Sequence, residues 1–188
     1  MKKKWLFIGA AIAALLQTGF LYASIETRAS ILRSGRELVL QTRPVDPRDL
    51  MRGDYVILGY DISSVRIKDI RGQQQANDRR TVYVALKPDA EGNWHFSRAS
   101  FTPFTDLDAQ EVQVRGRSHY VISPDADHSI PLVYGIERYY VPEGEGRAIE
   151  KGQQEKRITV VVAVNASGTA VIKALRDNGR QLHKEPLY

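Results

Sequence analysis

An uncharged stretch near the N-terminus constrains the fold of this chain more than any other feature. Residues 5–25, WLFIGAAIAALLQTGFLYASI, contain no charged residue and no proline. A helix of this length is about 30 Å long at 1.5 Å per residue, which matches the hydrocarbon thickness of a bilayer. Trp5 and Tyr22 lie near its two ends, where aromatic rings favour the membrane interface. The stretch therefore predicts a transmembrane helix over residues 5–25.

A cleaved signal peptide is the alternative interpretation of the same stretch. Cleavage requires small residues at the end of the apolar run. The best candidate cut follows Ala23, and Leu21, at the third position before that cut, is too bulky. We therefore expect residues 1–25 to be an uncleaved signal anchor.

The orientation of this anchor follows from the lysines at positions 2–4. Under the positive-inside rule they keep the N-terminus in the cytoplasm. The chain is therefore expected to be a single-pass protein of the bacterial cytoplasmic (inner) membrane. Its C-terminal domain would lie in the periplasm or outside the cell.

The charge of the remaining chain argues against a nucleic-acid partner. The 27 basic residues, less the three N-terminal lysines, leave 24 against 22 acidic ones. No block of lysine and arginine after the anchor is long enough to follow a phosphate backbone. The chain also has no cysteine, which excludes disulfides, thiolate catalysis and thiolate-bound zinc.

The residues after the anchor indicate one mainly β domain. Residues 26–36 are expected either to continue the helix briefly or to form a juxtamembrane linker, with Gly35 as a natural stop. From residue 37 to 188, apolar runs alternate with turn signals. We expect about eight strands, over residues 37–42, 55–62, 81–88, 93–101, 111–122, 132–141, 158–164 and 169–175. This pattern predicts a small barrel- or sandwich-like domain with short helical turns.

Several details of this domain can be predicted. Residues 81–101 form one expected hairpin, and residues 158–175 form a second, with its turn at 165–168. The arm at 158–164 is apolar on both faces and should lie centrally in a sheet. We expect a long polar loop over 66–80 and a short helix over 145–153.

The stretch RPVDPRDLMRGDYVILGYDIS at 43–63 concentrates residues with special shapes. Asp46 can act as a helix N-cap, Pro47 suits the first helical position, and Asp49 falls at the third. Gly53 suits a left-handed C-terminal cap. We expect one helical turn here, followed by a strand that begins at Asp54.

The strand after this turn has two faces with period two. Asp54, Val56, Leu58 and Tyr60 share one face. Tyr55, Ile57 and Gly59 share the other. The Asp54 carboxylate is placed to accept N–H groups of the preceding turn, so the stretch is expected to be mainly a structural corner. Binding through Asp54 or Tyr55 is the alternative.

The octapeptide at 53–60 has the form GDYxxLxY. It resembles the GDYXXLXY protein family of uncharacterised, membrane-anchored bacterial proteins. The lead-in at 43–52 and the segment YGIERYYVPEGEG at 134–146 are similar to those of that family. The residues matching its two segments are Asp46, Pro47, Asp49, Gly53, Asp54, Tyr55, Leu58 and Tyr60, then Tyr134, Gly135, Arg138, Tyr139, Glu143 and Gly144. The family has no assigned activity, and its members are commonly encoded near polytopic membrane proteins, which implies such a partner.

The sequence indicates no catalytic centre and no cofactor. Signal-peptidase-like proteases place a nucleophilic serine shortly before a Gly-Asp pair, and residues 43–52 contain no serine. The four histidines show no metal-site spacing, although Asp125, Asp127 and His128 form a polar turn. We therefore expect no metal site.

Two hypotheses for function remain. The first is a non-enzymatic interaction or accessory module of a polytopic membrane protein. Acidic residues at 143, 145 and 150, beside Arg138 and Arg147, can dock a basic loop of such a partner or stay solvated. The second is a carboxylate-dependent binder or hydrolase of a small ligand or envelope polymer, which uses Asp54, Glu143 or Glu145. The five tyrosines at 55, 60, 134, 139 and 140 suit either an interface or half-buried sheet faces.

Overall fold

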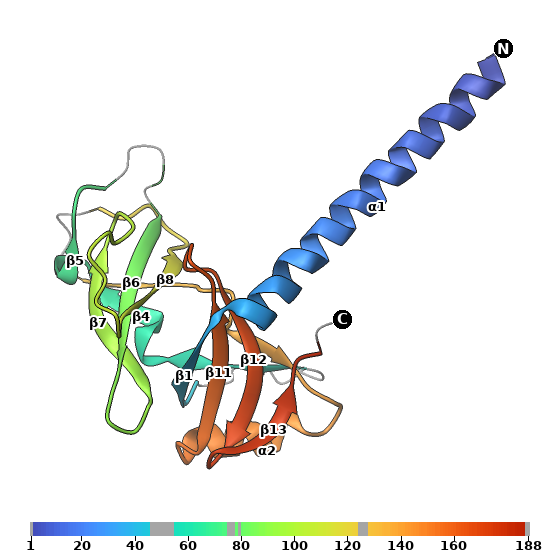
Figure 1. Ribbon diagram of the computed structural model, residues 1–188. Helices are drawn as coiled ribbons and strands as arrows, with labels where there is room; N and C mark the ends of the chain where they lie inside the picture. Colours follow the sequence, from blue (N-terminus) through green and yellow to red (C-terminus); the bar gives the residue numbers. More distant parts are fainter. Residues whose placement is uncertain (1, 46–54, 75–77, 79, 124–127, 187–188) are drawn as a thin grey trace.

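The computed structural model of the protein describes residues 2–45, 55–74, 78, 80–123 and 128–186. Within them lie two helices, α1 (Lys2–Ser34) and α2 (Gly146–Gln154), and thirteen strands (Figure 1). The strands are β1 (Arg36–Arg43), β2 (Tyr55–Ile57), β3 (Gly59–Tyr60), β4 (Ser64–Arg66), β5 (Ile70–Arg71), β6 (Thr81–Pro88), β7 (Trp94–Ser100), β8 (Val112–Arg117), β9 (Ser129–Pro131), β10 (Arg138–Tyr140), β11 (Ile158–Val164), β12 (Ala170–Asp177) and β13 (Arg180–Lys184).

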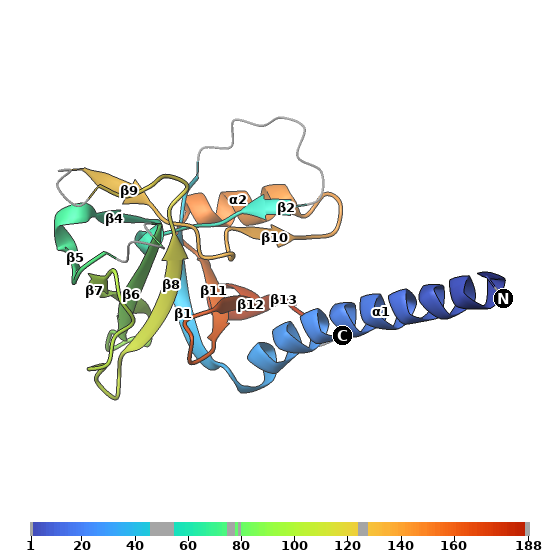
Figure 2. The same ribbon diagram turned by 90° about the horizontal axis from the view of Figure 1, so that it is seen from above.

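The N-terminal apolar stretch forms one continuous helix, α1, which extends away from the β domain (Figures 1 and 2). Within the described part of the chain it is the helix long and apolar enough to cross a membrane, with Phe7–Ser34 as the candidate span. The β domain does not bury its most apolar part. The helix predicted over residues 5–25 is therefore present, and it is longer than predicted.

The base of α1 is packed onto the domain. Residues 26–36 follow the first of the two expected alternatives, because the helix continues to Ser34. Ala29, Ile31 and Leu32 are buried where α1 contacts β11 and β12. The helix ends at the predicted stop, where the Gly35 N–H donates to the Ile31 carbonyl at 2.8 Å. Helix and domain are therefore joined by packing as well as by the chain.

The larger sheet is antiparallel, with strand order β13–β12–β11–β1–β3. β11 lies at its centre, as its two apolar faces predicted. The predicted hairpin β11–β12 is confirmed, and its turn is closed by a bond from the Gly168 N–H to the Asn165 carbonyl. Gly168 has φ +83°, a left-handed conformation that favours glycine.

The second sheet has strand order β5–β7–β6–β8. Its β6–β7 hairpin confirms the prediction for residues 81–101. The prediction of a long loop over 66–80 is wrong at its start. Ile67 and Ile70 are buried, and Ile70 pairs in parallel with Ala99 of β7. These two apolar side chains fix the first part of an otherwise polar segment.

Two small sheets complete the fold, β10–β2 and β4–β9. Three predicted strands are shorter here than expected. The run 55–62 is interrupted at Leu58 and ends as a strand at Tyr60, where a 3-10 turn, Asp61–Ser63, begins. The run 132–141 is a strand only at β10, because Gly135 has φ +84°, and the run 111–122 ends as a strand at Arg117.

The sheets share one hydrophobic core and pack in a sandwich-like arrangement, with the four-stranded sheet on the left of Figure 1 and the five-stranded sheet on the right. A backbone bond of 2.8 Å from Arg115 to Gly168 joins them. Within the described strands, no sheet closes into a barrel. The predicted mainly β class is confirmed, and the number of strands exceeds eight because several have two or three residues. The predicted helix over 145–153 is present as α2.

Candidate functional site

The described part of the GDYxxLxY motif forms strands β2 and β3. Its lead-in and its first two residues lie outside the described residues, so the predicted helical turn and the role of Asp54 are untested. The residues concerned are Asp46, Pro47, Asp49, Gly53 and Asp54. Asp125 and Asp127 of the polar turn also lie outside.

The motif strand has the two faces that its sequence predicts. Val56, Leu58 and Tyr60 are buried. Tyr55 and Ile57 are half-buried and point the opposite way. The alternation of residues along the strand therefore separates a core face from an outer face over one short strand.

The segment at 134–146 lies directly against this motif strand. β10 pairs with β2 in antiparallel register, with Arg138 opposite Ile57 and Tyr140 opposite Tyr55. Beyond the ladder, the Leu58 N–H donates to the carbonyl oxygen of residue 137 at 2.9 Å. The two segments singled out in the sequence are therefore one structural unit.

Two buried tyrosines fasten this unit by reciprocal hydrogen bonds. The Tyr60 hydroxyl donates to the Ile136 carbonyl at 2.7 Å. The Tyr134 hydroxyl donates to the Ile62 carbonyl, also at 2.7 Å. Burial, with a smaller effect of the nearby Glu137 carboxylate, raises the pKa of both hydroxyls above the ordinary tyrosine value. Both tyrosines therefore remain protonated donors at neutral pH.

The turn that carries Tyr134 is held by a carboxylate. Glu137 accepts hydrogen bonds from the N–H groups of Tyr134 at 2.6 Å and Gly135 at 3.0 Å. The left-handed conformation of Gly135 makes this return of the chain possible. We did not single out Glu137 from the sequence. A glycine followed two residues later by a carboxylate was the signal available for it.

The outer side of the β2–β10 ladder carries four side chains that we call the aromatic–arginine face: Tyr55, Ile57, Arg138 and Tyr140. The rings of Tyr55 and Tyr140 lie 5.9 Å apart between centroids. The Arg138 guanidinium carbon lies 5.6 Å from the centre of the Tyr55 ring, within the range of a cation–π contact. Tyr140 is 71% exposed, whereas Tyr139 beside it is buried.

A pocket of about 380 Å³ adjoins this face. It is lined by Ile57, His119, Val133, Gly135, Glu137 and Arg138. The Glu137 carboxylate already accepts hydrogen bonds from two backbone N–H groups. The polar side chains that the pocket offers to a ligand are therefore those of His119 and Arg138. The face and the pocket together form the candidate functional site.

Comparison with known protein families decides the relationship that these segments indicate. The family model described as GDYXXLXY protein matches residues 17–175, which include the last part of α1 and nearly all of the β domain. The chain belongs to the GDYXXLXY protein family. No curated protein and no solved structure matches the chain.

The structure separates the five tyrosines of the two family segments into two groups. Tyr60, Tyr134 and Tyr139 are buried. Tyr55 is half-buried and Tyr140 is exposed. The sequence left open whether these tyrosines serve an interface or sheet packing. The three buried tyrosines serve sheet packing, and Tyr140 lies at the surface. Tyr140, which we did not include among the site residues, is the most exposed of them.

The acidic residues of the second family segment are not gathered in one cleft. Glu143 is exposed, and Gly144 beside it has φ +87°. The Glu145 carboxylate lies 2.8 Å from Nε2 of His183 on β13. The His183 ring is 6.1 Å from that of Tyr139, whose pKa burial raises to about 12. Glu145 therefore belongs to a contact that ties the segment to the edge of the large sheet.

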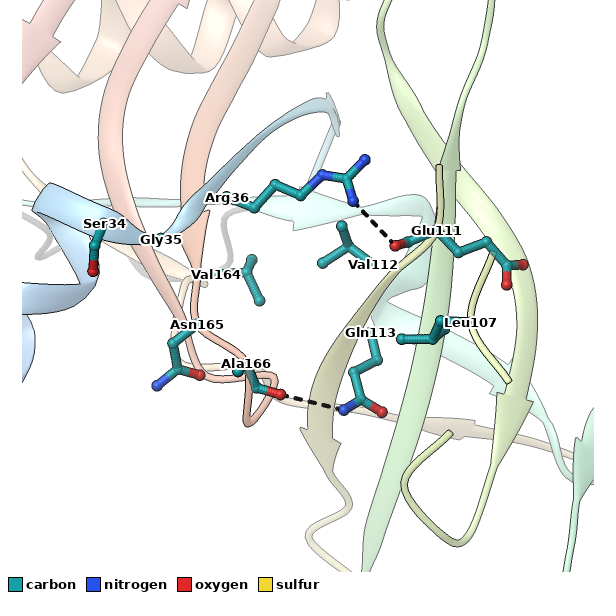
Figure 3. Close-up of a pocket in the computed structure, with 10 residues that line it drawn as sticks. All are labelled: Ser34, Gly35, Arg36, Leu107, Glu111, Val112, Gln113, Val164, Asn165 and Ala166. Atoms are coloured by element: carbon teal, nitrogen blue, oxygen red, sulfur yellow. Dashed lines mark hydrogen bonds between the residues drawn. The ribbon is translucent and has the colours of Figure 1, made fainter. Parts of the chain in front are cut away.

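A second pocket, of about 460 Å³, lies where the base of α1 meets the two main sheets (Figure 3). Arg36 reaches across it and donates to the carbonyl oxygens of Ala109 at 3.1 Å and Glu111 at 3.4 Å. Gln113 donates to the Ala166 carbonyl at 3.4 Å on its other side. These bonds join the two sheets across the pocket, so its polar groups serve the packing of the domain.

The described residues give no indication of metal chemistry. Over the described ranges, no group of three or more His, Asp or Glu side chains is close enough to hold a metal ion. His128, the described member of the polar turn, contributes its carbonyl oxygen to the Ile67 N–H.

Proposed function

We propose that this GDYXXLXY protein is a single-pass, membrane-anchored accessory module that binds a polytopic membrane protein through the aromatic–arginine face. In this proposal it is not an enzyme. Its N-terminus lies in the cytoplasm, and its β domain lies in the periplasm or outside the cell. The observation that carries the proposal is the exposed Tyr140, whose ring is tilted against that of Tyr55, on a ladder made by both family segments. Arg138 lies over the Tyr55 ring of the same ladder.

The anchor supports a partner within the membrane. The apolar part of α1 is not covered by the domain, and the lysines at 2–4 precede it. A lipid-exposed helix of this length suits a single span, and the lysines favour a cytoplasmic N-terminus. An anchored domain meets other membrane proteins at high local concentration.

The composition of the face supports protein binding. Tyrosine and arginine are the residues most often found at the energetic centres of protein interfaces. The segments that carry the face are joined by the hydrogen bonds of Tyr60 and Tyr134. The loop between β10 and α2 lies on the side of the domain toward which α1 extends (Figures 1 and 2). This position favours contact with a partner that emerges from the same membrane.

The carboxylate-dependent alternative has less support. Glu145 is paired with His183, and Glu137 is engaged by backbone N–H groups. Glu143 is exposed and is not among the residues that line the candidate pocket, and Asp54 lies outside the described residues. Paired-carboxylate chemistry needs two acids a few ångströms apart across a substrate. We therefore propose docking and no second function.

The test is purification of the full-length chain from its native membranes in mild detergent. We expect a polytopic membrane protein in stoichiometric amount, and its loss with Tyr140→Ala and with Arg138→Ala. Phe96→Ala is the matched control, because Phe96 is an exposed aromatic residue on β7 of the other sheet. A preparation free of any partner, or equal loss with Phe96→Ala, would contradict the proposal.

A further inference from the structure

The C-terminal end of the chain is fastened to α1 just above its apolar stretch. The Arg28 guanidinium forms an ion pair with Glu185 at 3.2 Å. The Glu185 N–H donates to the Lys173 carbonyl of β12 at 2.9 Å, so its backbone is fixed by the sheet. The Lys173 side chain in turn donates to the Leu32 carbonyl of α1 at 3.2 Å. Sheet and helix therefore hold Glu185 at a defined height along α1.

This height falls in the headgroup layer of a bilayer that α1 crosses. The uncharged stretch ends at Ile25, and α1 continues without a break through Arg28. Three residues add about 4.5 Å along the axis. The headgroup layer on each side of the hydrocarbon is roughly 5–7 Å thick. Arg28 and its partner Glu185 then lie among the headgroups.

The neighbours of Glu185 present suitable chemistry to lipid. Lys184 and Pro186 are exposed, and Leu182 is 41% exposed. β13 and the base of α1 lie on the same side of the domain (Figures 1 and 2). An exposed lysine at this depth can reach the phosphate groups while its methylene chain covers apolar surface.

We propose that residues 184–186 form a lipid-contacting seat, in which Lys184 binds phospholipid phosphate groups and fixes the height of the β domain over the membrane. The inference rests on the proposed membrane anchoring by α1. It adds a second, peripheral membrane contact at the opposite end of the chain. The seat would hold the aromatic–arginine face in one orientation relative to a membrane partner.

The test uses single cysteines, which the chain otherwise lacks. The Pro186→Cys variant of the full chain, with Lys184 kept and with Lys184→Gln, carries a nitroxide spin label in nanodiscs of phosphatidylethanolamine and phosphatidylglycerol. Leu16→Cys, in the middle of the uncharged stretch, is the hydrocarbon reference. Glu91→Cys, exposed in the β6–β7 turn, is the aqueous reference. The measurement is the collision rate of each label with a water-soluble nickel complex.

We expect a collision rate at 186 that is severalfold below that at 91 and above that at 16, and Lys184→Gln should raise it. Glu185→Gln, which removes the ion pair with Arg28, should raise the rate at 186. A rate at 186 equal to that at 91 with Lys184 kept, while 16 is protected, would overturn the seat and leave the anchor intact. A rate at 16 equal to that at 91 would overturn the anchor and the seat together.

Discussion

The hydroxyl group of Tyr60 donates a hydrogen bond of 2.7 Å to the carbonyl oxygen of Ile136, 76 residues away in the chain. This contact joins the last residue of the family motif to the second family segment. It explains why the motif ends in a tyrosine, since phenylalanine would fill the same space and leave the carbonyl without its donor. Tyr60 of the motif thus helps to hold the segments 53–60 and 134–146 together.

The first prediction concerns the two reciprocal bonds. Tyr60→Phe should lower the free energy of unfolding by about 1–3 kcal/mol, because it leaves a buried carbonyl without its donor. Tyr134→Phe should cost a similar amount, since its hydroxyl serves the Ile62 carbonyl in the same way. Chemical denaturation of the full chain in detergent measures both. Tyr140→Phe is the matched control, and equal stability of all three variants would contradict this account.

A second prediction concerns the close approach of β8 to the Tyr134 ring. A Cβ atom added at Gly116 would lie 2.8 Å from Cε1 of Tyr134 and 3.2 Å from Cβ of Leu132. The ring has little freedom to move, because its hydroxyl is bonded to Ile62. Gly116→Ala should therefore destabilise the domain by about 1–3 kcal/mol.

The matched control for this substitution is Gly146→Ala at the start of α2. A Cβ atom there would come no closer than 3.6 Å to Val56. Its effect should stay within about 0.5 kcal/mol. In the Tyr134→Phe background, Gly116→Ala should cost less than in the wild type, because the freed ring can shift. An unchanged cost in that background would show that the hydroxyl bond does not hold the ring.

The third prediction concerns stability at acid pH. Burial raises the pKa of Glu111, but hydrogen bonds from Arg98 and Ser97 outweigh it and hold the pKa below the usual value of 4.5. A carboxyl with a lowered pKa in the folded state contributes stability above its unfolded pKa and loses it as the pH falls through the folded pKa. The free energy of unfolding should therefore fall as the pH drops below about 5.

The variant that tests this contribution is Glu111→Gln, with denaturation measured at several pH values from neutral to acid. It should be less stable than the wild type at neutral pH and show a shallower loss toward acid pH. Glu91→Gln, in the exposed β6–β7 turn, should keep the wild-type slope. If the free energy of unfolding of Glu111→Gln fell with pH as steeply as that of the wild type, other carboxyl groups would be the cause of the acid sensitivity.

The helix and the long strands could be predicted from the sequence, because each depends on a repeating pattern of apolar residues within one short segment. The apolar stretch at 5–25 predicted α1, and alternating residues predicted both long hairpins. Strand ends were less predictable, because they depend on distant contacts. Leu58 interrupts its strand with a bond to residue 137, far away in sequence, and Gly135 interrupts another by its left-handed conformation.

The candidate site was predictable only in part. The sequence indicated the two family segments, and the burial of Leu58 and Tyr60 follows from period two. The pairing of β2 with β10 could not be predicted, because the sequence of one strand does not determine which distant strand it pairs with or in which register. The aromatic–arginine face exists only through that register, which places Tyr140 opposite Tyr55.

The most direct test of the central claim is site-specific photocrosslinking in native membranes. A photoreactive amino acid at position 140 of the full chain samples the aromatic–arginine face, and one at position 96 samples an exposed strand of the other sheet. We predict one abundant adduct from position 140, identified by mass spectrometry as a polytopic membrane protein, and its absence from position 96. No adduct from position 140, or the same adducts from both positions, would contradict the claim that this face binds a membrane partner.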